Sequence, residues 1–479
     1  MHPNELNPAA PGHFEQFGIT PEVLDQVMRA ALSLGATDCD LFFEHKVSTA
    51  VALTDSKVNR ASTDVDLGLG VRARVGDQIG YAFTEDLSLE AMLRAARTAA
   101  GIARSTPGVA PVDLSPLALP DRYPVTDPWS IVGMDKRVPM VRAWEEAAFK
   151  LDPRIEKVQT SLADVEKWIL LARPDGRMAE DYQPMTRAHV VCTAVQGDVR
   201  ESNSYNLAQR AGLEFYSDQA RIDRMVQKAV ERTLFLLDAG KPPAGDMPVV
   251  LAAGASGILL HEAIGHGLEA DFNRKGVSIY AARMDQKVAP DFVTVVDDGT
   301  VPGARGAINV DDEGNEPERT VLIENGVLRS YMHDEISASH YGVAPTGSGR
   351  RQSFRHHPLP RMRSTYMDPG PHDPEEIIKN TKRGIYATSF SNGAVQIGAG
   401  DFTFYMKTGY LIEDGKLTRP IKDVNIIGNG PAALEQVDMV GSDLVLDEGG
   451  WTCGKDGQGV PVSQGQPTVR VASLVVGGE

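Results

Sequence analysis

The chain contains little cysteine and few aromatic residues. Its three cysteines, Cys39, Cys192 and Cys453, have no regular spacing among 479 residues. So sparse and odd a set argues against a disulfide framework and is typical of a reducing compartment. Aromatic residues make up only 6%, whereas there are 46 glycines and 30 prolines. This composition predicts many short strands and turns rather than long helical bundles.

Long apolar runs and an excess of positive charge are also missing. No stretch approaches the roughly 18 consecutive apolar residues of a membrane-spanning helix, and the longest candidate, 247–260, is interrupted by glycine and serine. Residues 1–14 are polar and lack the pattern of a signal peptide, so we expect a cytoplasmic protein. The net charge of -17 argues against nucleic-acid binding, which needs a positive surface. We therefore expect neither nucleic acid nor membrane as a partner.

The first half of the chain shows helical and extended patterns in alternation. Helical spacing of apolar residues predicts helices at 21–34, 87–103, 135–151 and 218–237. Extended segments are predicted at 40–53, 66–75, 78–83, 158–172 and 185–195. The order helix–strands–helix occurs twice, separated by the proline-rich segment 108–128, which suggests a degenerate repeat.

The sequence changes character at the Gly-Lys-Pro-Pro-Ala-Gly segment, 240–245. Beyond it, strand and turn signals dominate, with strands indicated at 292–297, 319–328, 394–404 and 467–476 and one strong helix at 255–268. We predict an α+β protein with a mixed α/β N-terminal domain, 1–240, and a β-rich domain, 241–479, that carries the metal-binding helix. The N-terminal part is either one domain or two subdomains split near 108–130.

The helix at 255–268 contains two histidines and a glutamate. His261 and His266 supply the imidazoles that bind Zn²⁺, and Glu262 stands beside the first of them, where it can act on a bound water. Ser256 is a candidate N-cap. These residue types together predict hydrolytic zinc chemistry.

The spacing of the two histidines requires a distortion of the helix. They are five residues apart, which in a regular α-helix separates them by about 140° around the axis. A single π-type turn brings the second histidine under the first, and Gly265 makes such a departure inexpensive. We predict this distortion over residues 263–266.

Zinc in a hydrolase needs a third protein ligand. Cys453 lies between glycines in a predicted turn, and Lys455 would favour its thiolate form. The residue types alone leave other candidates open, namely Glu269, Asp271, His333, His340, His356, His357.

Three segments resemble the TldD/PmbA family, specifically its TldD branch: 260–269 around the two histidines, 349–353 and 452–455. The resemblance extends from about residue 18 to the C-terminus. It implies a zinc metallopeptidase of peptides or unfolded chains, with zinc bound by His261, His266 and Cys453 and Glu262 as catalytic acid/base. It also implies assembly with a TldE/PmbA-type sibling subunit, with a homodimer as the alternative.

Several further hypotheses remain open. The β-rich half is suited to bind substrate by strand addition. Candidates to stabilise the oxyanion are Tyr280, Tyr331, His333, His340, Arg350. The arginines between 350 and 363 suggest a solvated loop or subunit contact. The alternative function is a non-catalytic zinc-containing peptide-binding or modification-chaperone subunit, which would not need Glu262. A hydrolase of small amides is a second alternative.

Overall fold

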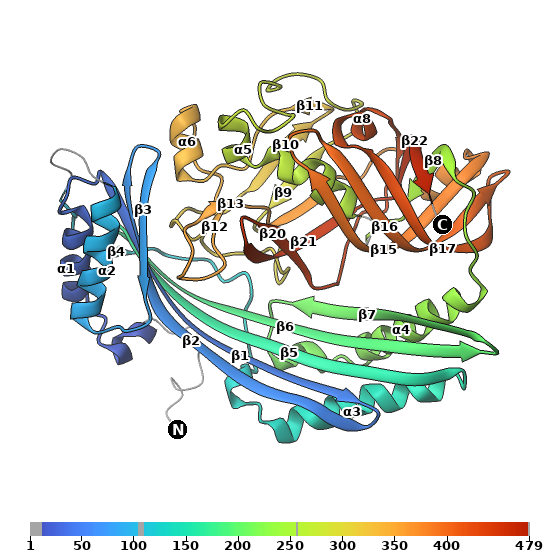
Figure 1. Cartoon of the computed structure of the whole chain (residues 1–479), viewed down its shortest axis with the longest axis horizontal. Helices are drawn as coiled ribbons and strands as arrows, with labels where there is room; N and C mark the ends of the chain where they lie inside the picture. Colours follow the sequence, from blue (N-terminus) through green and yellow to red (C-terminus); the bar gives the residue numbers. More distant parts are fainter. Residues whose placement is uncertain (1–11, 104–109, 255–256, 478–479) are drawn as a thin grey trace.

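The computed structural model describes residues 12–103, 110–254 and 257–477. The predicted α+β architecture is confirmed. A long curved sheet formed by the N-terminal half lies beneath a β-rich C-terminal half (Figure 1). No helix among the described residues has the length and apolar character to cross a membrane.

The N-terminal sheet joins the two helix–strands–helix blocks of the sequence. Its strand order is β3-β2-β1-β5-β6-β7, and the short β4 also pairs with β6. The central pair β1 and β5 is antiparallel, with Leu41 opposite Ala172, so the two blocks meet at this ladder. The strands are β1 (Asp38–Thr54), β2 (Lys57–Val75), β3 (Gln78–Thr84), β4 (Ser115–Pro116), β5 (Ile155–Ala172), β6 (Arg177–Gln196) and β7 (Val199–Gln209).

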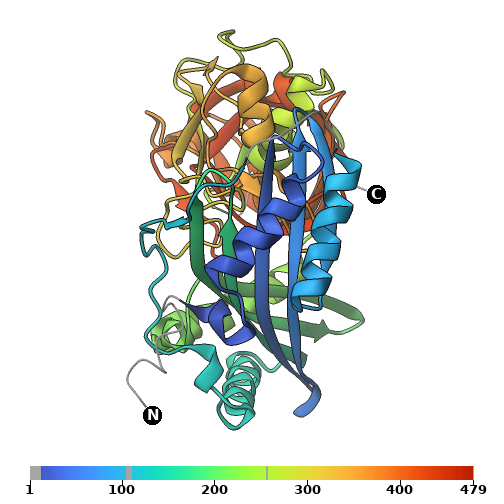
Figure 2. The same cartoon turned by 90° about the vertical axis from the view of Figure 1, so that its left-hand side faces the viewer.

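Four helices pack on this sheet close to the predicted positions. Helices α1 (Pro21–Leu32) and α2 (Leu89–Ile102) contact β1–β3, whereas α3 (Met134–Leu151) and α4 (Gln219–Asp238) contact β5–β7 (Figure 2). Thr20 caps α1, because its side chain accepts a hydrogen bond from the Val23 backbone N–H. The apolar stripe of each helix is buried, so amphipathic spacing determined these elements.

The C-terminal half contains a closed ring of strands, β17-β16-β15-β8-β22, in which β22 pairs back to β17. These strands are β8 (Gly245–Leu251), β15 (Arg383–Gln396), β16 (Asp401–Glu413), β17 (Lys416–Asn429) and β22 (Val469–Gly477), with β18 (Val437–Val440) attached to β22. The single strand predicted at 394–404 is wrong, because this segment contains the turn between β15 and β16. Gly400 occupies the turn with φ of 78°.

A second sheet lies beside the ring, in the order β11-β10-β9-β14-β21-β19 with β20 paired to β21. Its strands are β9 (Val295–Asp298), β10 (Arg319–Glu324), β11 (Val327–Leu328), β14 (Ser364–Met367), β19 (Val445–Leu446), β20 (Trp451–Lys455) and β21 (Gln458–Gln466). A separate short ladder joins β12 (Gly349–Arg350) to β13 (Leu359–Pro360). Short helices absent from the prediction are α5 (Ala270–Arg274), α6 (Glu335–Tyr341), α7 (Pro374–Lys379) and α8 (Gly430–Glu435). They are too short for a periodic pattern to develop.

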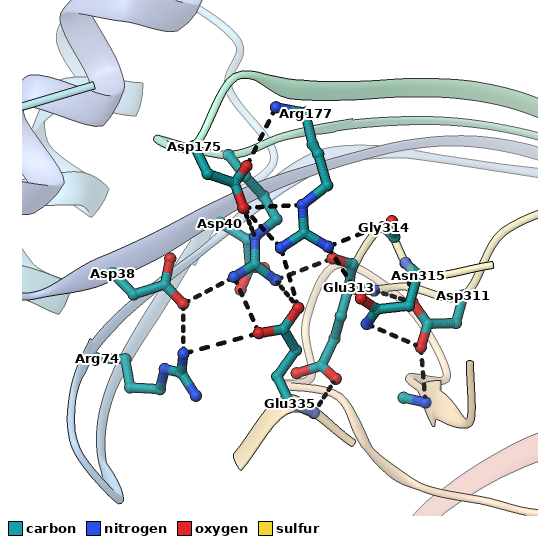
Figure 3. Close-up of polar contacts among 12 residues, drawn as sticks. Asp38, Asp40, Arg74, Asp175, Arg177, Asp311, Glu313, Gly314, Asn315 and Glu335 are labelled. Carbon is teal, nitrogen blue, oxygen red and sulfur yellow. Dashed lines mark hydrogen bonds and ion pairs between the residues drawn. The ribbon is translucent and has the colours of Figure 1, made fainter. Parts of the chain in front are cut away.

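Buried and partly buried ion pairs join the two halves. Arg72 of β2 donates to Glu313 at 2.7 Å, and both side chains are at most 1% exposed. Arg177 of β6 donates a hydrogen bond to the Glu335 carboxylate of α6 at 3.0 Å, and Arg74 of β2 lies 3.8 Å from the same carboxylate (Figure 3). Hydrogen bonds to charged groups in a buried site are strong and directional, so these contacts fix how the sheet sits against the β-rich half.

The expectation of a solvated loop at 350–363 is wrong for four of its five arginines, whereas Arg355 is partly exposed. Arg351, Arg361 and Arg363 are at most 2% exposed, and Arg350 is 4% exposed. Arg351 donates to Asp40 of β1 at 2.8 Å, a partner far away in sequence. These guanidinium groups are part of the interior rather than of a surface patch. The proposed domain division near residue 240 stays a prediction.

Candidate metal centre

The motif helix is a π-helix over Leu259–Gly265, followed by a 3-10 turn over His266–Leu268. The backbone N–H of His266 donates to the carbonyl of His261, which is the five-residue hydrogen bond of a π-turn. The predicted widening is therefore confirmed, and it begins earlier than expected. The predicted cap Ser256 lies outside the described residues. Gly265 faces Met362 so closely that a Cβ atom would collide with the methionine sulfur.

The π-turn brings His261 and His266 together with Cys453. One ligand atom from each of the three lies within 4.8 Å of the others. The two imidazole rings are 5.1 Å apart at 84°, and Cys453 Sγ lies 3.6 Å from His266 Nε2. All three residues are at least 95% buried. Cys453 was expected in a turn; it lies instead in β20, paired with Val460 of β21.

The other sequence candidates lie outside this group of ligand atoms in the described part of the chain. Asp271 binds Lys455 at 2.6 Å, and His333 packs among tyrosine rings. His340 is exposed on α6, and His356 contacts Ser353. His357 packs at the edge of the Tyr81 ring. Glu269 contacts Nδ1 of His266, whereas the Nε2 atom of the same ring faces Cys453.

Glu269 binds the ring nitrogen of His266 that does not face Cys453. Its Oε2 lies 3.0 Å from His266 Nδ1 and 3.2 Å from Lys455 Nζ, and its side chain is fully buried. Burial alone would raise the pKa of Glu269, but Lys455 and His266 lower it to about 2, so the carboxylate stays charged. In the neutral form of His266, a carboxylate that accepts from Nδ1–H leaves the Nε2 lone pair directed towards Cys453. The sequence suggested Lys455 as a partner of the thiolate, whereas the structure pairs it with Glu269.

The charges of the cluster favour a thiolate. Burial raises the pKa of Cys453, but His261 and His266 bring it well below its ordinary value. Burial lowers the pKa of His266, and Glu269 together with Cys453 raises it well above the ordinary value. A thiolate beside imidazoles is the donor set that zinc prefers.

The buried imidazole of His261 has a ring nitrogen without a hydrogen-bond partner among the residues that the structure covers. His261 Nδ1 has no hydrogen bond from any residue that the structure describes. An unsatisfied buried nitrogen costs free energy unless something else occupies it. Together with the compact His, His, Cys set, this orphan atom fits a bound zinc ion.

Glu262 differs from the three buried residues because it is only half-buried. It lies against Gly393 of β15, where an added Cβ atom would come within 3.1 Å of Glu262 Cγ. Burial raises the pKa of its carboxyl, although the two histidines counteract this. A raised pKa and partial access to solvent suit a residue that exchanges protons with substrate or water.

Two candidates for oxyanion stabilisation, Tyr331 and Arg350, already donate hydrogen bonds to backbone carbonyl groups. The Tyr331 hydroxyl donates to the Tyr280 carbonyl at 2.9 Å, and Arg350 donates to the Met362 carbonyl at 2.6 Å. The Tyr280 hydroxyl is buried and lacks a hydrogen-bond partner within the described ranges. Its ring lies against Gly267, next to His266. Tyr280 therefore remains a candidate with an uncommitted donor, as does His333, whose buried Nδ1 also lacks a hydrogen-bond partner among the described residues.

Comparisons with known proteins agree with this architecture. A curated "Metalloprotease TldD homolog" of Haemophilus influenzae is 37% identical over 92% of both chains. A "Zinc metalloprotease TldD homolog" of Saccharolobus solfataricus is 34% identical over 60% of this chain and 64% of its own. The crystal structure of TldE from Thermococcus kodakarensis shares the fold, with a TM-score of 0.74, 17% identity, and coverage of 94% of this chain and 100% of that one.

Family models match most of the chain. The model for PmbA/TldA metallopeptidase domain 1 matches residues 39–103, that for the central domain matches 127–237, and that for the C-terminal domain matches 244–478. The last match includes the histidines, the glutamate and the cysteine of the cluster. On these matches and on the identity to TldD homologues, the chain belongs to the TldD/PmbA family of metallopeptidases.

Proposed function

We propose that the protein is a zinc-dependent peptidase that cleaves peptides or unfolded polypeptides. His261, His266 and Cys453 would hold the zinc, and Glu262 would act as general base and acid. The observation that carries the proposal is the convergence of the three ligand atoms within 4.8 Å beside a half-buried carboxylate. The zinc named for the Saccharolobus solfataricus relative supports the choice of metal.

Bound zinc would supply a Lewis acid that lowers the pKa of water and polarises a carbonyl group. Glu262 would accept a proton from the attacking water and pass it to the leaving amine. Glu269 would keep His266 in the tautomer whose Nε2 faces the cluster. Substrate would be held as an added strand, which reads the backbone and tolerates many sequences.

Two substitutions separate the roles within the site. Glu262→Gln preserves the shape of the side chain but removes its basicity, so we expect bound zinc and loss of cleavage by at least about 100-fold. Cys453→Ala removes a ligand and should lower zinc content, whereas Cys192→Ala, in a buried strand elsewhere, should not. Zinc is measured by mass spectrometry of the purified protein, and cleavage by mass spectrometry of an unfolded peptide. Undiminished turnover in Glu262→Gln would refute the assigned role.

The same assay tests the non-catalytic alternative. A zinc-containing binding subunit would retain peptide and metal without producing fragments in any combination of subunits. For the partner we propose a TldE/PmbA-type sibling or a second copy of the chain. Light scattering of the purified protein, alone and mixed with a sibling subunit, measures which of the two forms.

A further inference from the structure

A polar cavity of about 310 Å³ lies between the N-terminal sheet and the β-rich half. Its walls come from β6, β7 and α4 on one side and from β15, β16 and the segment 447–451 on the other. Figure 1 shows β7 running below the strands of the ring. The side chains that matter for its chemistry are Arg187, His189, Arg232, Ser391, Lys407, Trp451.

The cavity contains two arginines without an acidic partner. Neither Arg187 of β6 nor Arg232 of α4 has a carboxylate within salt-bridge distance among the described residues; Arg232 stacks 4.6 Å from the centre of the Tyr205 ring. This contrasts with the arginines that join the two halves, which reach carboxylates. In a chain of net charge -17, two guanidinium groups without salt bridges in one cavity favour the binding of an anion there.

The other charged groups of the cavity are already engaged. The Asp447 carboxylate accepts from the Trp451 indole N–H at 2.7 Å and from a backbone N–H at 2.8 Å. Lys407 binds Asp423 at 2.8 Å. Burial and the charge of Arg187 lower the pKa of His189 to about 4, so this imidazole is neutral at pH 7. The charge of Asp447 also acts on Arg232, from beyond salt-bridge distance, and counteracts the lowering of the Arg232 pKa by burial. Among the described residues, neither arginine of the cavity has a direct carboxylate partner.

Two strands, β15 and β20, run from the lining of the cavity to the candidate metal centre. Trp451 lines it, and Cys453 follows two residues later on the same face of β20. Ser391 also lines it, and Gly393, which lies against Glu262, follows two residues later on β15. Two residues of strand span roughly 6.6 Å. A peptide with its scissile bond at the metal centre would thus place a group one or two residues away in this cavity.

We propose that this cavity is a specificity site for a substrate carboxylate, bound by Arg187 and Arg232. The inference rests on the proposed peptidase function and adds its substrate class: peptides with a carboxylate one or two residues from the cleaved bond. A planar guanidinium group binds a carboxylate in bidentate geometry, which a neutral amide cannot match. The carboxylate is either an acidic side chain or the C-terminus of the peptide.

Four matched peptides distinguish these sources. They combine Glu or Gln at the position under test with a free or an amidated C-terminus, and kcat/KM is measured with the zinc-loaded full chain. We expect about a tenfold preference for the peptide with the recognised carboxylate. Arg187→Gln and Arg232→Gln should each reduce this ratio towards one. Arg224→Gln, an exposed arginine on the same helix α4, should retain it.

The salt dependence and a binding measurement complete the test. Raising the ionic strength should lower the preference in the wild type, because screening weakens charge recognition. If no peptide is cleaved, the proposed activity fails, and calorimetric binding of the same four peptides still tests the cavity. Carboxylate-selective binding that both arginine variants lose supports the site. Equal rates or affinities for all four peptides, or a preference that survives both substitutions, overturns it.

Discussion

Replacing Glu269 with glutamine tests whether the buried residues around the cluster tune a metal. The substitution keeps the size of the side chain and removes the charge that faces His266 Nδ1 at 3.0 Å. The carboxamide can still contact the imidazole, but it no longer raises the basicity of the ring or neutralises Lys455. The prediction is weaker zinc binding in a protein that still folds.

The expected magnitude follows from the contacts. Loss of an outer partner of a ligating histidine typically lowers metal affinity by about 10- to 100-fold, or about 1.4–2.7 kcal/mol. Breaking a buried ion pair completely costs about 3–5 kcal/mol of stability. The cost should be below that range, because Lys455 keeps Asp271 at 2.6 Å as a second partner.

Zinc affinity is measured by competition with a chromophoric chelator, and stability by urea denaturation of the metal-free protein. Asp271→Asn is the matched control, because it removes the other carboxylate from Lys455 without touching a histidine. We expect it to lower stability and leave zinc affinity within about threefold. Equal zinc affinities in Glu269→Gln and the wild type would show that the carboxylate serves only to neutralise Lys455.

Two further substitutions test the surroundings of the site. Gly393→Ala adds a Cβ atom 2.9 Å from the Phe404 ring, 3.0 Å from Ile258 Cδ1 and 3.1 Å from Glu262 Cγ. Because these groups must shift to make room, Glu262 should be displaced, and we expect kcat to fall about tenfold with zinc content unchanged. Gly240→Ala, with open space around it, should have no effect. Arg72→Met leaves two buried carboxylates without their shared cation and should lower the free energy of unfolding by about 3–5 kcal/mol in chemical denaturation. The partly exposed Arg177→Gln should cost about 1 kcal/mol or less, and equal losses for both arginines would contradict this reasoning.

The sequence predicted the features that local chemistry determines. Thr20 followed by Pro21 marked the start of α1, and the structure shows the cap. The five-residue step from His261 to His266 required the helix to widen or to break before both could bind one ion, and the π-helix is the widened form. In both cases neighbouring residues limit the conformations available to the backbone.

Features set by distant partners were not predictable in this way. The flanking glycines suggested a turn at Cys453, but its ladder with β21 makes it a strand. The arginine-rich segment near residue 350 has the composition of an exposed loop. Arg351 is nevertheless buried, because it forms an ion pair with Asp40, which is far away in the sequence. Burial of a charge depends on its partner, and no local pattern of the sequence reveals which partner folding will supply.

The position of β20 explains how one strand can supply one ligand, Cys453, and support a second, His266. Alternation along a strand places Cys453 and Lys455 on the same face, 1% and 6% exposed, towards the π-helix. Cys453 approaches His266 directly, whereas Lys455 reaches it through Glu269. A shift of β20 would therefore displace a ligand and the support of another ligand together. The cluster depends on the β20–β21 hairpin as much as on the motif helix, although the hairpin lies some 190 residues further along the chain.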